Sequence, residues 1–108
     1  MTELRALSAA LFGPHLNTVF TMVSEEGLEI AATLVACNEH PRNTMRGTLR
    51  TAFDLLLECP AEEVPHFNGA SFTIGHPAVE SFGPVYVERI NPATPAGADT
   101  AVFQIIFN

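Results

Sequence analysis

Apolar side chains recur at every second position in several segments of this chain, and turn-forming residues separate those segments. Every second residue across 28–36 is apolar, and Phe53, Leu55 and Leu57 share one face of the stretch 49–59. Such alternation is typical of β-strands that have one buried face and one wetter face. We therefore expect a sheet protein.

Turns rather than crossover helices separate the expected strands, so the sheet is predicted to be mainly antiparallel. An apolar stripe before Gly13-Pro14 predicts one short N-terminal helix. The predicted fold is an all-β small barrel or sandwich of about six strands, forming a single domain over residues 1–108. Pro84 is expected to kink its strand or to place it at an edge. The expected strands are 18–23, 28–37, 49–59, 69–74, 82–90 and 100–107.

Charge excludes two classes of partner. The 108 residues contain 12 acidic and five basic side chains, for a net charge of −7. Binding to nucleic acid or to an anionic membrane surface needs clusters of Lys and Arg on a basic protein, so neither is expected. The chain shows no export signal and no apolar run that would span a membrane, which predicts a cytoplasmic protein. Cys37 and Cys59 are accordingly expected to be reduced and buried.

The histidines and cysteines show no spacing typical of metal ligands, so we expect neither a metal nor another cofactor. Three of the histidines adjoin a proline, which favours a structural role in turns. The four histidines are His15, His40, His66 and His76.

We interpret His15, His76, Pro77 and Asn108 as structural pins. The residue before a proline is driven to extended geometry, so the His76 ring is expected to hydrogen-bond across one end of the barrel, near Asn108. His15 is expected to do the same at the other end.

Asp54 is the carboxylate that stands out, because it lies inside a strand between Phe53 and Leu55. The alternation favours an outward position on the wetter face. The alternative is that Asp54 faces a groove with a raised pKa and acts with a histidine in a ligand-binding barrel or an unrecognised hydrolase. No nucleophile motif and no glycine-rich phosphate loop supports the alternative, so no catalytic residue is assigned.

A small basic island interrupts the acidic chain. Arg42, Arg46 and Arg50 lie in the segment 41–50, which has no acidic residue and is rich in loop formers. We predict that these arginines bind a partner by pairing with carboxylates, either on a second copy of the chain or on another acidic protein.

Several short motifs resemble those of a bacterial family of small all-β proteins described as a domain of unknown function, often encoded near phage-tail-collar-like proteins. The motifs are Phe12-Gly13-Pro14-His15, the strand 28–35, the segment Gly69 to His76-Pro77, and the ending Phe107-Asn108. The resemblance implies no activity and suggests an accessory or assembly role. Phe72 and Phe103 stand where the family usually has tyrosine.

The sequence therefore favours a non-enzymatic protein that acts through protein–protein contacts, including self-association. The stretches 82–90 and 103–107 are candidates for pairing with another chain wherever they lie at a sheet edge. The assembly of a phage-tail-like or surface structure is the process that the resemblance suggests.

Overall fold

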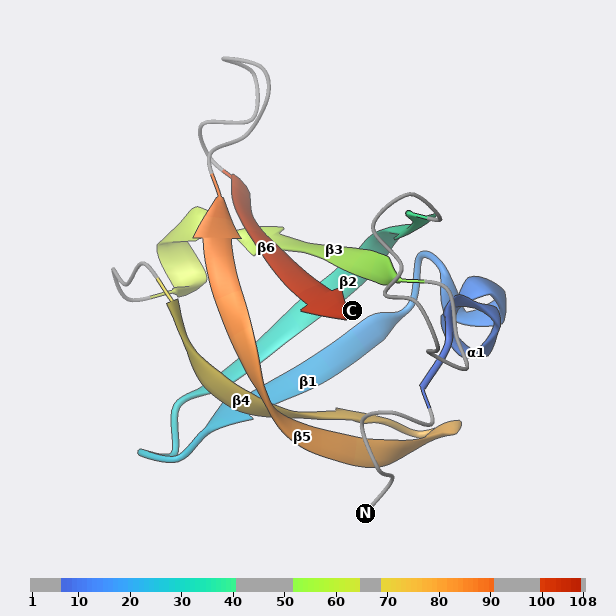
Figure 1. The fold of residues 1–108 in the computed structure, drawn as a ribbon. Helices are drawn as coiled ribbons and strands as arrows, with labels where there is room; N and C mark the ends of the chain where they lie inside the picture. The colour runs from blue at the N-terminus through green and yellow to red at the C-terminus, as the bar shows by residue number, and fades with distance from the viewer. Residues whose placement is uncertain (1–6, 41–51, 65–68, 91–99, 108) are drawn as a thin grey trace.

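The computed structural model describes residues 7–40, 52–64, 69–90 and 100–107, and these form a closed antiparallel barrel of six strands with one short α-helix at the N-terminal side (Figure 1). The predicted fold class is confirmed. The elements are α1 (Ala9–Phe12), the 3₁₀ turn η2 (Gly13–His15), β1 (Val19–Ser24), β2 (Glu29–Glu39), β3 (Phe53–Pro60), the 3₁₀ turn η4 (Ala61–Glu63), β4 (Gly69–His76), β5 (Val79–Ile90) and β6 (Thr100–Phe107).

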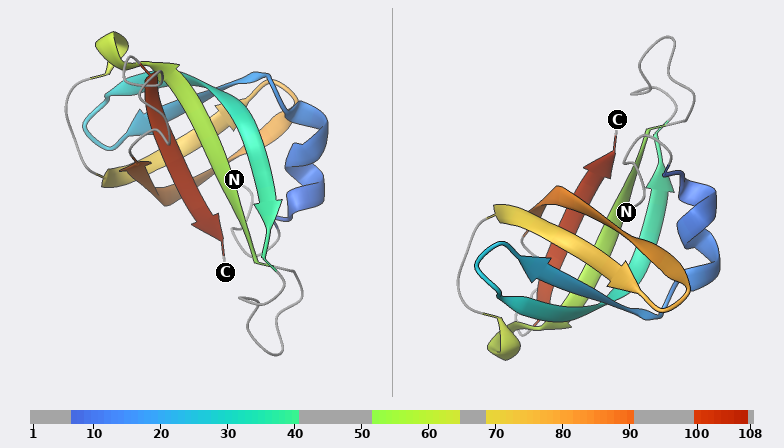
Figure 2. Two further views of the ribbon diagram at one scale, coloured as in Figure 1. Left: turned by 90° about the horizontal axis from the view of Figure 1, so that it is seen from above. Right: turned by 90° about the horizontal axis from the view of Figure 1, so that it is seen from below.

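The barrel is a ring of two three-stranded meanders. The strand order around the ring is β1-β2-β3-β6-β5-β4, so β1 to β3 form one meander and β4 to β6 the other. The meanders meet at two seams, where β1 pairs with β4 and β3 pairs with β6, and both pairings are antiparallel. Figure 2 shows α1 at one end of this ring and η4 at the opposite end.

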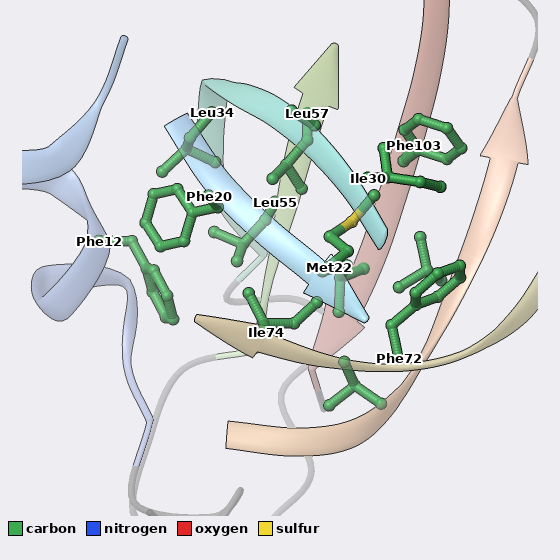
Figure 3. Packing of buried hydrophobic residues seen from close by; sticks show 14 of the residues in the cluster. Phe12, Phe20, Met22, Ile30, Leu34, Leu55, Leu57, Phe72, Ile74 and Phe103 are labelled. Atoms are coloured by element: carbon green, nitrogen blue, oxygen red, sulfur yellow. The ribbon is translucent and has the colours of Figure 1, made fainter. Parts of the chain in front are cut away.

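Alternate residues of all six strands point inward and fill the barrel (Figure 3). Alternation therefore builds the core, as β-geometry requires when one face is buried. The largest fully buried side chains are Phe12, Phe20, Phe53, Phe72, Phe82, Phe103, Leu7, Met22, Leu34, Leu55, Leu57 and Ile74.

Phe12 closes the end of the barrel beside α1. Its ring centroid lies 6.2 Å from that of Phe20, 5.9 Å from that of Phe53 and 5.6 Å from that of Phe82. A fourth ring, Phe107, lies at 6.4 Å. One aromatic side chain from the N-terminal segment thus joins β1, β3, β5 and β6.

The N-terminal helix differs from its expected form. The apolar stripe before Gly13-Pro14 consists of Leu4, Leu7, Ala10 and Leu11 and predicted one buried helix face. Leu4 lies outside the described residues and Leu7 is buried, but Leu11 is 38% exposed and Ala10 is also exposed. Phe12 takes the core position because α1 is a single turn of four residues that passes directly into η2.

Pro84 interrupts the pairing of β5, as expected. The register between β4 and β5 shifts between Phe72 and Ile74, opposite the pair Gly83-Pro84. Gly83 has a φ of 133°, and a Cβ at this position would lie 2.8 Å from the carbonyl oxygen of Phe72. Only glycine fits this close approach without strain.

Candidate functional site

The histidine cluster, which consists of His15, Thr18, Phe20 and His76, lies at the α1 end of the barrel. The ring centroids of His15 and His76 are 4.7 Å apart, and those of Phe20 and His76 are 4.5 Å apart. Nε2 of His76 lies 3.0 Å from Oγ1 of Thr18. The pairing of β1 with β4 brings these residues together.

The hydrogen bonds of this cluster define the tautomer of His76. Thr18 donates its hydroxyl hydrogen to the carbonyl oxygen of His15, at 2.5 Å, so its oxygen accepts from Nε2–H of His76. The backbone N–H of Ala78 donates to Nδ1 of His76, at 3.0 Å. His76 is therefore a neutral imidazole with both nitrogens occupied. Partial burial, followed by the neighbouring His15, lowers the pKa of His76 below its usual value.

The pin interpretation placed His15 and His76 at opposite ends of the barrel, and that placement is wrong. The two rings are in contact at one end, because β4 ends beside the turn that precedes β1. His76 does hydrogen-bond across this end, but its partner is Thr18. Pro77 is exposed in the turn after β4, and Asn108 lies outside the described residues.

A second group, the Asp54 cluster, consists of Asp54, Asn38, His40 and Gln104. Nδ2 of Asn38 donates to Oδ1 of Asp54 at 3.2 Å, and Nε2 of Gln104 donates to Oδ2 at 2.9 Å. Nε2 of His40 lies 3.1 Å from the same Oδ2. These partners come from β2, from the residue after β2 and from β6, which flank β3 on its two sides.

Asp54 occupies the outer face of β3, as the alternation predicted, because Phe53 and Leu55 on either side belong to the core. It is nevertheless buried, with only 7% of its surface exposed. Sequence reasoning did not find Asn38 and Gln104 as its partners, and no local pattern marks them. Their proximity depends on which strands lie beside β3.

The two cysteines are free thiols, and Cys59 is buried. Cys37 is half-buried, and its Sγ donates to the carbonyl oxygen of Ala9 at 3.7 Å. Partial burial raises the pKa of the Cys37 thiol, and the carboxylates of Glu39 and Asp54 raise it further. A raised pKa disfavours the nucleophilic thiolate, so Cys37 lacks the environment of a catalytic cysteine.

An open hollow of about 390 Å³ lies on the outer surface of β2, β3 and β6, at the end away from α1. It shares no residue with the Asp54 cluster, so the hollow and the polar cluster do not form one site. The residues that line it are Thr33, Val35, Glu58, Cys59, Pro60 and Thr100.

The predicted partner-binding residues Arg42, Arg46 and Arg50 lie outside the described residues, as does His66. Within the described ranges, no group of three or more His, Cys, Asp or Glu side chains is arranged to hold a metal ion. The same part of the chain contains no helix with the length and apolarity needed to cross a membrane.

Comparison with known proteins gives a family but no characterised relative. The sequence profile of a family described as "Domain of unknown function (DUF6916)" matches residues 7–107. Searches of curated proteins and of solved structures give no match.

Proposed function

The chain belongs to the family described as a domain of unknown function (DUF6916), and we propose that it is a non-enzymatic accessory protein that acts through protein–protein contacts. The proposal rests on the hydrogen bonds of Asp54 and His76, two side chains that could otherwise take part in acid–base chemistry. Asp54 accepts hydrogen bonds at both carboxylate oxygens, and both ring nitrogens of His76 are occupied. These groups hold the barrel together.

The interior of the barrel is packed with side chains, so a binding function would use the outer surface. Small barrels whose interiors are packed with side chains have no central ligand cavity, and large aromatic and aliphatic residues fill this one. On the outside, Val19 is 53% exposed, Tyr86 is 60% exposed and Ile106 is 58% exposed. Exposed aromatic and aliphatic side chains of this kind are common in protein interfaces.

The arginine segment supplies the polar part of the proposed contact. Arg42, Arg46 and Arg50 follow β2 and precede β3 in the chain. On a protein of net charge −7, they favour an acidic partner, and a second copy of the chain is such a partner. The chain resembles bacterial proteins encoded near phage-tail-collar-like proteins. This resemblance supports a role for it, as a cytoplasmic protein, in the assembly of a phage-tail-like or surface structure.

The test is the oligomeric state of the purified protein, measured by light scattering across a range of concentrations. We expect self-association that the triple variant Arg42→Glu, Arg46→Glu, Arg50→Glu abolishes. The matched control replaces the same three residues by lysine, which keeps the charge and should retain most of the association. A protein that stays monomeric and retains no defined partner from extracts of its own cells contradicts the proposal.

A second candidate function rests on His40, which lies 3.1 Å from Asp54 and is 39% exposed at its side chain. A buried carboxylate that orients an exposed imidazole is an arrangement that general-base catalysis uses. The candidate is a protein that binds or hydrolyses a small ligand on the outer face of the barrel, beside Asp54 and His40. A panel of ester and amide substrates tests it. Turnover that His40→Gln and Asp54→Asn abolish, and that Glu58→Gln leaves unchanged, would support it over the contact function.

A further inference from the structure

The N-terminal cap, defined as residues 7–16, docks on the barrel through two fully buried side chains, Leu7 and Phe12. It contains one helical turn and one 3₁₀ turn, and such short elements depend on docking for their stability. Phe12 anchors the cap among four aromatic rings of the barrel. The carbonyl oxygen of His15 accepts the hydroxyl hydrogen of Thr18, which adds a polar connection next to this anchor.

His76 connects the cap to β4, and so to the meander of β4 to β6. It is the last residue of β4, and its ring contacts His15 of the cap on one side and Phe20 of β1 on the other. Through Thr18 it also supports the hydroxyl that holds the His15 carbonyl. The contacts of this one imidazole therefore span the cap, β1 and the turn between β4 and β5.

Protonation would change these contacts in a defined way. A second proton must go to Nδ1, which accepts the backbone N–H of Ala78. Two donors would then face each other, and the turn bond would be lost. The new positive charge would also lie against the ring of His15, at a centroid distance of 4.7 Å.

Among the described residues, His15 is the titratable group that acts on the His76 ring, and it disfavours the added charge. The cap contributes His15, and β1 contributes Phe20, which does not titrate. On β5 the nearest acid is Glu80, an exposed residue. Glu80 follows Val79, the buried pairing partner of His76, so strand alternation places it on the outer face of β5.

We propose that His76 is an acid-sensitive latch, whose protonation loosens the N-terminal cap and uncovers the aromatic end of the barrel beneath Phe12. The lowered pKa of His76 determines how the stability of the docked cap depends on pH. The pKa of His76 in the folded protein lies below the ordinary value of 6.5, so the unfolded or uncapped state binds the proton more readily. The stabilisation is complete above pH 6.5, and it falls as the pH drops from 6.5 toward the lowered folded pKa.

The experiment measures hydrogen-exchange protection factors of the amides in residues 8–16 between pH 7.5 and pH 5.5. In the natural sequence we expect protection to fall by up to about tenfold per pH unit below 6.5, since one proton is linked. In His76→Asn this fall should disappear, because asparagine can accept the Ala78 N–H through a turn bond and does not titrate. His40→Gln is the control and should keep the fall.

Protection that stays constant down to pH 5.5 in the natural sequence overturns the latch, as does an equal fall in His76→Asn. Should His76→Asn fail to fold, ring-nitrogen NMR of the natural protein at pH 7.5 decides the question. A neutral His76 with its hydrogen on Nε2 supports the proposal, and a charged ring or a hydrogen on Nδ1 overturns it. Neither the hydrogen-exchange measurements nor the NMR measurement depends on what the protein binds.

Discussion

Gln104 on β6 donates its side-chain amide to Oδ2 of Asp54 on β3, over 2.9 Å, across one of the two seams where the meanders meet. The two residues are 50 positions apart in the chain. Asn38 of β2 completes the carboxylate on its other side. One buried acid thus links three adjacent strands.

Asp54→Asn is expected to lower the free energy of unfolding by about 1–3 kcal/mol. The asparagine amide places a donor where a carboxylate oxygen accepts, so at least one of Asn38 and Gln104 loses its partner. Urea denaturation measures the change. Glu58→Gln, on an exposed position of the same strand face, is the control and should change stability by less than about 0.5 kcal/mol. Equal effects of the two substitutions would contradict this role of Asp54.

Phe12→Ala is expected to cost about 3–5 kcal/mol, because it removes a fully buried ring from contact with four others. A domain of this size has a total stability of about 5–15 kcal/mol, so the variant should be close to its folding limit at 37 °C. Thermal unfolding followed by circular dichroism checks it. Leu11→Ala, one residue earlier and 38% exposed, should cost far less, and a similar loss would show that Phe12 is no anchor.

Gly83→Ala is expected to destabilise the protein by more than about 1 kcal/mol, because alanine is strained at a φ of 133° and its Cβ would meet the carbonyl oxygen of Phe72 at 2.8 Å. Gly13→Ala is the matched control, since no heavy atom lies within 4 Å of the added carbon there and the φ is −50°. Chemical denaturation of both variants should show a large loss for Gly83→Ala and little change for Gly13→Ala. A tolerant Gly83 would mean that the β5 bulge adjusts easily.

Cys37 should react slowly with iodoacetamide at pH 7, more slowly than the thiol of a small peptide. Its raised pKa reduces the thiolate fraction, and half-burial restricts access. Mass spectrometry of timed samples measures the rate, and unfolding in urea should restore the ordinary rate. Rapid labelling of the folded protein at pH 7 would contradict the assigned environment.

The strands could be predicted from the sequence because each one is a local pattern. The expected strand 100–107 coincides with β6, and 49–59 contains most of β3. The histidine and Asp54 clusters could not be predicted, because each is made by strand neighbours that are distant in the chain. Thr18 and His76 are 58 positions apart and meet only because β1 pairs with β4. Alternation indicates which face a residue occupies but not which strand lies beside it.

Closure of the ring has a kinetic consequence. Four of the strand pairings join consecutive strands, but the seams β1–β4 and β3–β6 join strands from different halves of the chain. The chain loses conformational entropy when those long loops close, and it does so before the stabilising contacts of either seam form. Folding is therefore expected on the millisecond-to-second scale of non-local β topologies. Until the second seam forms, each meander exposes open strand edges to other chains. Refolding yield should therefore fall with protein concentration, although the finished ring pairs those edges with each other.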